Sequence, residues 1–102
     1  MYDDLSYREF DGEKGEPAEL SLFALSYCDH CHEAIAFLKE KNISFRYLFL
    51  DTLPSESRGP LLRELKRRTN NELIFPVLET KEETIKGFSK EGWLEALALP
   101  AR

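Results

Sequence analysis

The chain has 102 residues and a formal net charge of −5 at pH 7; 42% of its residues are hydrophobic and 32% are charged. This length and composition are typical of one folded domain, and the acidic balance argues against a nucleic-acid-binding surface. No apolar stretch approaches the ~20 residues that a helix needs to cross a bilayer, and the start of the chain lacks the basic and apolar segments of a secretion signal. We therefore expect a cytoplasmic protein that binds neither nucleic acid nor membrane.

Residues 1–18 are rich in Asp, Glu and Gly. We predict a partly ordered N-terminal extension here, followed by one domain at 19–102, because chain termini are poorly ordered unless contacts hold them. Tyr7 and Phe10 either pack on the domain or form a short edge strand, and we favour a partly ordered arm over a strand.

The first half of the domain has the pattern of a strand, a helix and a second strand. Residues 19–26 form a nearly continuous apolar run, which is typical of a strand buried on both faces. Apolar residues then recur at helical spacing up to Lys41, and Asn42 is expected to end the helix. From 44 to 51 the apolar period changes to two, which predicts a second strand. A strand, helix and strand over this distance predict two parallel strands joined by a right-handed crossover.

A loop and a second helix are predicted next. Residues 53–59 contain proline, serine and glycine and are predicted as a loop, with Pro60 in the first turn of the helix. The three cations at 66–68 suit the negative end of the helix dipole, and Asn70 and Asn71 are suited to end the helix.

The last part of the chain predicts a hairpin and a third helix. Two short apolar runs, at 73–79 and 84–87, flank a polar turn and predict an antiparallel pair of strands. Ser89 is expected to cap the final helix, whose buried face includes Trp93.

Cys28 and Cys31 are the two cysteines of the chain, and two residues separate them. A redox-active C-x-x-C pair is expected between a strand and a helix in a βαβ unit, and this pair lies at that place. Unpaired backbone N–H groups and the positive end of the helix dipole favour a thiolate there. Cys28 is nearer the helix start, so we expect it to be the more exposed thiol and the nucleophile, with Cys31 resolving the mixed disulfide.

Three other interpretations of this segment remain open. With His32 it matches the C-x-x-C-H pattern of covalent haem attachment, in which the histidine ligates the iron. That pattern predicts an export signal and a second axial ligand, and neither is evident, because Met1 is the only methionine. A zinc site needs ligands from elsewhere in the chain, and no second cysteine or histidine cluster exists, so no metal is expected. A structural disulfide closing so short a loop restrains little chain entropy.

The order βαβ, α, ββα resembles the thioredoxin fold in its glutaredoxin-like form, an α/β fold with a four-stranded mixed sheet and three helices. Three motifs within residues 19–99 carry the resemblance. They are the dithiol Cys28-Asp29-His30-Cys31, the cis-proline segment Phe75-Pro76-Val77 and the glycine-led turn Gly87-Phe88-Ser89. The resemblance implies a cis bond before Pro76, and a proline is in any case tolerated mainly at the first residue of a strand.

The resemblance also implies an activity and a binding groove. It implies a thiol–disulfide oxidoreductase in which Cys28 and Cys31 are catalytic. The backbone of Phe75 would pair with an extended substrate, as a short case of strand addition. The residues expected to bind substrate are Tyr27, Phe75, Pro76, Phe88 and Ser89.

The two residues between the cysteines are expected to tune the acidity of Cys28 in opposite directions. The Asp29 carboxylate disfavours a neighbouring thiolate, while the His30 imidazole favours it. His32 is expected to face solvent and to point away from Cys28 by helical spacing.

This chain departs from the pattern of glutaredoxins that use glutathione, and the departures indicate its electron donor. Glutaredoxins that use glutathione usually carry a lysine three residues before the first cysteine and a tyrosine as the third motif residue, where this chain has Leu25 and His30. The acidic residue expected after the glycine-led turn is replaced by Ser89-Lys90. We therefore expect weak or no dependence on glutathione, with a thioredoxin-reductase-like enzyme or another dithiol as donor.

The remaining expectations concern cofactors and substrates. No cofactor is expected, although glutathione stays open as an electron donor, and the substrates would be disulfide-containing proteins or small thiols. The alternative functions are a non-catalytic interaction domain of the same fold and a haem-carrying C-x-x-C-H protein.

Overall fold

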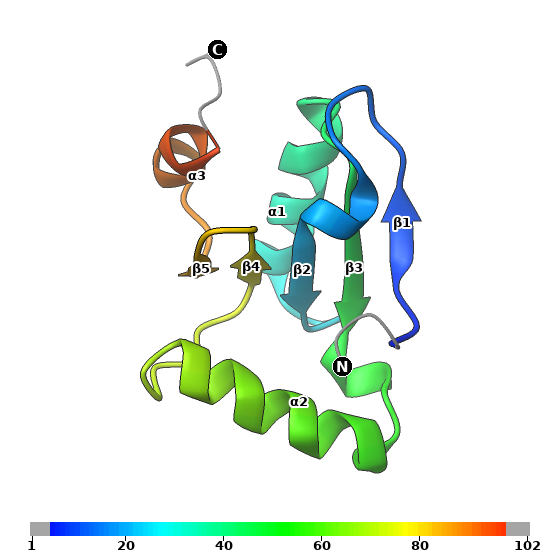
Figure 1. Cartoon of the computed structure of the whole chain (residues 1–102), viewed down its shortest axis with the longest axis vertical. Coiled ribbons are helices and arrows are strands. Elements are labelled where there is room, and N and C mark those ends of the chain that lie inside the picture. The colour runs from blue at the N-terminus through cyan, green and yellow to red at the C-terminus, as the bar shows by residue number, and fades with distance from the viewer. Residues whose placement is uncertain (1–4, 98–102) are drawn as a thin grey trace.

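The computed structural model describes residues 5–97 and folds them into a five-stranded mixed sheet with helices on both faces (Figure 1). The strands are β1 (Arg8–Phe10), β2 (Ser21–Ala24), β3 (Phe45–Phe49), β4 (Val77–Glu79) and β5 (Thr84–Lys86), in the spatial order β1-β3-β2-β4-β5. The helices are α1 (Asp29–Glu40), α2 (Ser55–Arg68) and α3 (Lys90–Ala96), with 3-10 turns η2 (Pro17–Glu19) and η3 (Leu50–Thr52). β2 and β3 are parallel and β4 and β5 are antiparallel, which confirms the predicted βαβ unit and hairpin. Within the described range, no helix is long and apolar enough to cross a membrane.

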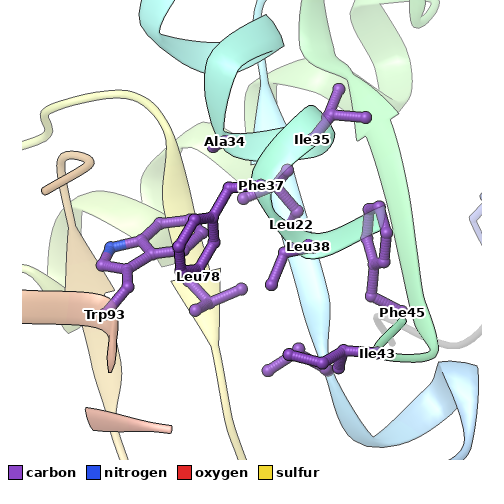
Figure 2. Packing of buried hydrophobic residues seen from close by; sticks show 10 residues of the cluster. Leu22, Ala34, Ile35, Phe37, Leu38, Ile43, Phe45, Leu78 and Trp93 are labelled. Carbon is purple, nitrogen blue, oxygen red and sulfur yellow. The ribbon is translucent and has the colours of Figure 1, made fainter. Parts of the chain in front are cut away.

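The core has two layers because side chains alternate between the faces of the sheet. On one face the strands pack against α1 and α3, through Leu22, Phe45, Leu78, Ala34, Ile35, Phe37, Leu38 and Trp93 (Figure 2). On the other face they pack against α2, through Phe23, Leu48, Val77, Leu61 and Leu65. The neighbours Leu22 and Phe23 therefore belong to different layers, as predicted for a strand that is buried on both faces.

α1 and α2 both end on asparagines in the left-handed backbone conformation, as predicted. Asn42 after α1 has φ 61°, and Asn71 after α2 has φ 64°. The N–H of Ile43 donates to the Leu38 carbonyl at 3.1 Å, and the N–H of Asn71 donates to the Lys66 carbonyl at 2.7 Å. These bonds belong to Schellman motifs, which satisfy carbonyls that a helix end otherwise leaves unpaired.

α2 begins at Ser55, five residues before the predicted start at Pro60. The N–H of Ser57 donates to the Pro54 carbonyl at 3.0 Å, so the first turn forms directly after Pro54. Pro60 lies inside the helix, where its missing N–H removes one bond of the ladder. The prediction of a loop at 53–59 is therefore wrong from Ser55 onward, because Pro54, with φ −60°, suits the entry to a helix as well as a loop.

β4 begins at Val77, later than predicted, and the segment before it lies outside the strand. The peptide bond between Phe75 and Pro76 is cis, as the resemblance implied. The carbonyls of Ile74 and Pro76 accept the N–H of Gly87 at 3.1 and 2.8 Å. Gly87 has φ 78°, a conformation that costs a residue with a Cβ about 1–2 kcal/mol, so glycine is needed at this turn.

The N-terminal segment differs from the prediction, because it adds a fifth strand to the sheet. β1 pairs antiparallel with β3, with Phe10 opposite Phe45. The Phe10 ring lies 5.8 Å from the Phe45 ring on one face of the sheet, and the Tyr7 ring lies 6.1 Å from the Phe23 ring on the other. Phe10 and Tyr7 therefore pack against opposite faces of the sheet.

Gly12 lets this segment lie against the chain that follows α1. A Cβ at Gly12 would be 2.4 Å from the carbonyl oxygen of Asn42, so the backbone would have to shift to accommodate any side chain. The N–H groups of Glu13 and Lys14 donate to the same carbonyl at 3.0 and 3.1 Å. The N–H of Ser44 donates to the carbonyl of Lys14 at 2.8 Å. Because these partners are distant in sequence, local composition did not reveal them.

Candidate active site

Three segments meet where the parallel strands β2 and β3 finish, at the tips of their downward-pointing arrows in Figure 1. The last residues of these strands, Ala24 and Phe49, are register partners. Since β4 runs antiparallel to β2, the residues before Val77 lie at the same end of the sheet as the residues after Ala24. This register places Pro76 at the end of the sheet that carries Cys28.

Cys28 is the N-cap residue of α1. Its backbone is extended, and its Sγ accepts the N–H of Cys31 at 3.3 Å. The N–H of Cys28 donates to the carbonyl of Leu25 at 3.2 Å, which closes the turn between β2 and the helix. The half-buried sulfur therefore lies beside backbone N–H groups at the end of the helix where negative charge is favoured.

Cys31 lies one helical turn further and has no exposed surface. Burial first, and then the hydrogen bond with Cys28, raise the pKa of the Cys31 thiol to about 12, and the negative charge of Asp51 contributes in the same direction. Both cysteines are free thiols in this structure. The pair thus consists of one accessible thiol and one that is strongly protected and held in its protonated form.

Two of the residues expected to bind substrate have aromatic side chains at the end of the sheet that carries Cys28. Tyr27, just before Cys28, is 74% exposed, and Phe75 is half-buried against the layer that faces α2. Pro76 is fully buried. Ile74, in the apolar run before Pro76, is 53% exposed, and sequence reasoning did not single it out.

Phe88 and Ser89, also expected to bind substrate, make contacts within the protein. The Phe88 ring packs edge-on against Trp93, with the ring centroids 4.8 Å apart. The Ser89 Oγ accepts the N–H of Gly92 at 3.1 Å, which confirms the predicted cap of α3. Phe88 thus packs against the core and Ser89 caps α3, and substrate binding by them stays a prediction.

Asp29 and His30 occupy the exposed first turn of α1. The Nδ1 of His30 lies 3.4 Å from Oε1 of Glu33, and both side chains are mostly exposed. Asp29 places its carboxylate at the positive end of the helix dipole, where negative charge stabilises a helix. Their effect on the acidity of Cys28 stays a prediction.

Sequence reasoning missed a hydrogen-bond network next to the dithiol. The Nε2 of His32 lies 2.7 Å from the carbonyl oxygen of Ser26 and donates to it, while the His32 ring packs 5.6 Å from the ring of Phe49. On the other side, the Asp51 carboxylate accepts the N–H of Ser26 at 2.8 Å and also its hydroxyl. His32 is exposed, as predicted, but its side chain turns back to the segment before Cys28. Asp51 is the last residue of the predicted second strand, a position that indicates this end of the sheet but does not reveal its bonds to Ser26.

The site does not fit covalent haem attachment. Cys31 has no exposed surface at which a bond to haem could form, and the Nε2 of His32 is engaged by the Ser26 carbonyl. Among residues 5–97, no group of three or more His, Cys, Asp or Glu side chains is placed to hold a metal ion.

A mixed sheet with three helices, and a cysteine pair at the start of α1, define a thioredoxin-like fold with a dithiol at the end of its first central strand. The glutaredoxin family model matches residues 20–85, which is well over half of the chain. The chain therefore belongs to the glutaredoxin family. A comparison with curated proteins found no match.

Three solved structures are similar to this chain. The glutaredoxin of Methanosarcina mazei Go1 has a TM-score of 0.78 at 22% identity and covers 91% of this chain and 88% of that protein. The methanoredoxin of Methanosarcina acetivorans has a TM-score of 0.76 at 23% identity and covers 94% and 98%. The glutaredoxin of Archaeoglobus fulgidus has a TM-score of 0.71 at 24% identity and covers 78% and 85%. At this identity the likeness concerns the fold, and it confirms the predicted glutaredoxin-like thioredoxin fold.

Proposed function

We propose that the protein is a thiol–disulfide oxidoreductase that reduces disulfides through Cys28 and Cys31. The observation that carries the proposal is the asymmetry of the two thiols. Cys28 is partly exposed and accepts the N–H of Cys31 at 3.3 Å, whereas Cys31 has no exposed surface. An accessible sulfur at a helix N-terminus suits attack on a substrate disulfide, and a buried thiol three residues later suits the second, intramolecular step. Membership of the glutaredoxin family supports the same activity.

The reaction consists of two exchange steps. The Cys28 thiolate attacks one sulfur of the substrate disulfide, so that a bond forms between them and the other sulfur leaves as a thiolate, which takes up a proton. Cys31 then loses its proton and attacks the Cys28 Sγ. This second step forms the Cys28–Cys31 disulfide and releases the second substrate thiolate. Two electrons have then passed to the substrate, and an external dithiol or two thiols return them.

The substrate is proposed to lie along the segment before β4. The register of β2 and β4 supports this placement, because it brings Phe75 and Pro76 to the end of the sheet where Cys28 lies. An extended substrate would pair with the Phe75 backbone as a short added strand. Tyr27 and Ile74 offer apolar side chains to the residues beside the substrate disulfide.

A dithiol donor is proposed rather than glutathione, whose two carboxylates need cations at the site. Leu25 packs against the core where many family members have a lysine, and His30 lies beside the carboxylate of Glu33. Arg67 and Arg68, near the end of α2, both donate to Glu64, so these two cations already have a carboxylate partner. These bonds lower the pKa of the Glu64 carboxyl to about 2. A thioredoxin-reductase-like enzyme or another dithiol in a reducing cytoplasm fits these features better.

Turnover with dithiothreitol as donor and a disulfide-bonded protein as substrate tests the activity. We expect the wild type to accelerate reduction clearly over dithiothreitol alone, and Cys28→Ser to lose about two orders of magnitude in rate or more. Cys31→Ser should instead accumulate a mixed disulfide with the substrate, which mass spectrometry detects. A folded wild type that is no faster than dithiothreitol alone would show a non-catalytic interaction domain.

The donor is tested separately, at one protein concentration, with glutathione and its reductase or with thioredoxin reductase. We expect turnover with thioredoxin reductase to exceed turnover with glutathione by about tenfold or more. Faster turnover with glutathione would contradict the proposed donor and leave the dithiol chemistry intact.

A further inference from the structure

Ser26 is held from both sides in the turn that leads to Cys28. Its N–H and hydroxyl both donate to the carboxylate of Asp51, the N–H at 2.8 Å. Its carbonyl accepts from the Nε2 of His32 at 2.7 Å. All the hydrogen-bonding groups of this residue are therefore engaged by two side chains, one from η3 and one from α1.

The contacts tie together three segments that meet at the dithiol. Asp51 follows β3, whose last residue, Phe49, also packs against the His32 ring at 5.6 Å. His32 lies on the first full turn of α1, where its own N–H donates to the Cys28 carbonyl at 3.2 Å. The end of β3 and the start of α1 are thus both fixed to the turn between β2 and α1.

Ser26 is two residues before Cys28, so its position determines where the turn places the sulfur. The turn itself contains one further backbone bond, from the N–H of Cys28 to the Leu25 carbonyl at 3.2 Å. A displacement of about 1 Å at a reacting atom is enough to cost a large factor in rate. A free Ser26 would leave the turn with few other restraints on its conformation.

We propose that Asp51 and His32 are positioning residues of the dithiol, which hold Ser26 between them and so fix Cys28 at the start of α1. Neither residue is assigned contact with the substrate or with the sulfurs. The inference rests on the proposed function, since it concerns how the attacking thiol is placed. The hydroxyl and the N–H of Ser26 lower the pKa of the Asp51 carboxyl, which keeps Asp51 ionised as the acceptor of both bonds.

The test isolates the attack by Cys28 in a Cys31→Ser background. Its rate constant is measured in single turnover at pH 7 with excess 2,2′-dithiodipyridine, a neutral disulfide whose released thiol absorbs light. His32→Phe keeps a ring against Phe49 and removes the donor, while His32→Gln keeps a donor. Asp51→Ala removes both acceptor oxygens, while Asp51→Asn can still bind both groups of Ser26, because its amide can donate to the hydroxyl oxygen.

We expect His32→Phe and Asp51→Ala to lose about tenfold in the rate of attack, and His32→Gln and Asp51→Asn to stay within about threefold of the background protein. Glu40→Ala, at the other end of α1, is the matched control and should leave the rate unchanged. Each protein is first shown to unfold cooperatively. If Asp51→Ala does not fold, the comparison of His32→Phe with His32→Gln tests the inference.

Two results would overturn the inference. One is attack within twofold of the background in both His32→Phe and Asp51→Ala, whatever their melting temperatures, since this would reduce the network to a stabilising contact. The other is an equal loss in the conservative and the disruptive variants. A background protein that does not attack the probe at all would overturn the proposed function and this inference together, whereas normal attack by all variants overturns the inference alone.

Discussion

The backbone N–H of Cys31 donates to the Sγ of Cys28 at 3.3 Å, so the sulfur of one cysteine caps the helix that buries the other. Each cysteine of the pair thus depends on the other for its surroundings. Cys28 gains a hydrogen-bond donor, and Cys31 gains a neighbour that opposes its ionisation. The different surroundings of the two thiols therefore follow from one helical turn.

Alkylation should distinguish the two thiols in the reduced protein. At neutral pH we expect iodoacetamide to modify Cys28 at least about tenfold faster than Cys31, because thiolates react and the pKa of the buried Cys31 is raised to about 12. Peptide mapping after brief exposure measures the ratio. Faster modification of Cys31 in the folded protein would reverse the assigned roles.

The stability of the reduced protein should depend on pH through Cys31. Its pKa rises from an ordinary 9.0 to about 12 on folding, so the folded state holds the proton more tightly than the unfolded state. This contribution is complete below pH 9.0 and is lost as the pH rises towards about 12. Denaturant unfolding should show reduced wild type losing stability over this range relative to reduced Cys31→Ser. Parallel curves for the two proteins would show that the Cys31 thiol titrates normally.

His30 should make the disulfide form more oxidising. An imidazole near the dithiol stabilises the reduced form when Cys28 is a thiolate, so His30→Tyr should lower the reduction potential by about 10–30 mV. Equilibration with dithiothreitol redox buffers measures the potential. Glu33→Gln removes the carboxylate 3.4 Å from His30 and serves as a comparison that leaves the imidazole in place. An unchanged potential in His30→Tyr would remove the imidazole from the mechanism.

Gly87→Ala should disturb the segment beside the dithiol. Gly87 has φ 78° and donates to the carbonyls of Ile74 and Pro76, so an added Cβ should cost about 1–2 kcal/mol of stability and displace this segment. We expect lower turnover together with a lower melting temperature. Gly92→Ala, whose Cβ would make only an ordinary contact of 3.4 Å with Ser89, is the matched control. Normal turnover in folded Gly87→Ala would separate this turn from substrate binding.

Gly12→Ala should detach the N-terminal segment without changing the chemistry. A Cβ there would lie 2.4 Å from the Asn42 carbonyl, and overpacking of this kind costs about 1–3 kcal/mol. Asn42 follows the end of α1, whereas Cys28 precedes its start, so the rate of attack by Cys28 should stay unchanged. Thermal unfolding and the single-turnover rate give the two quantities. A large loss of rate would show that β1 also supports the dithiol.

The elements that could be predicted from the sequence are those with a strong local pattern. The alternating residues of β3 and the helix stops at Asn42 and Asn71 were predicted and observed, because periodicity and left-handed asparagines act over a few neighbouring residues. The predicted start of α2 was wrong because Pro54 suits a loop and a helix entry equally well. β1 was named only as the less favoured alternative, because its anchor at Gly12 depends on a carbonyl far away in the sequence.

In the candidate site, too, the features with a local pattern could be predicted, and those that depend on distant contacts could not. The position of Cys28 at the start of a helix could be predicted from the apolar run before it and the helical pattern after it. The bonds from Ser26 to Asp51 and His32 could not, since they depend on the relative position of β2 and β3, which only the tertiary fold determines.

β1 also changes what the sheet offers to other proteins along its borders. β3, the longest strand of the described sheet, would otherwise present a row of unpaired N–H and C=O groups, on which a strand from another chain can assemble. With β1 in place, the edge strands of the sheet are β1 and β5. Each has three residues; β1 carries Arg8 and Glu9, and β5 carries Lys86. Short, charged borders are poor templates for further strands, so the N-terminal segment protects the protein against aggregation through its sheet.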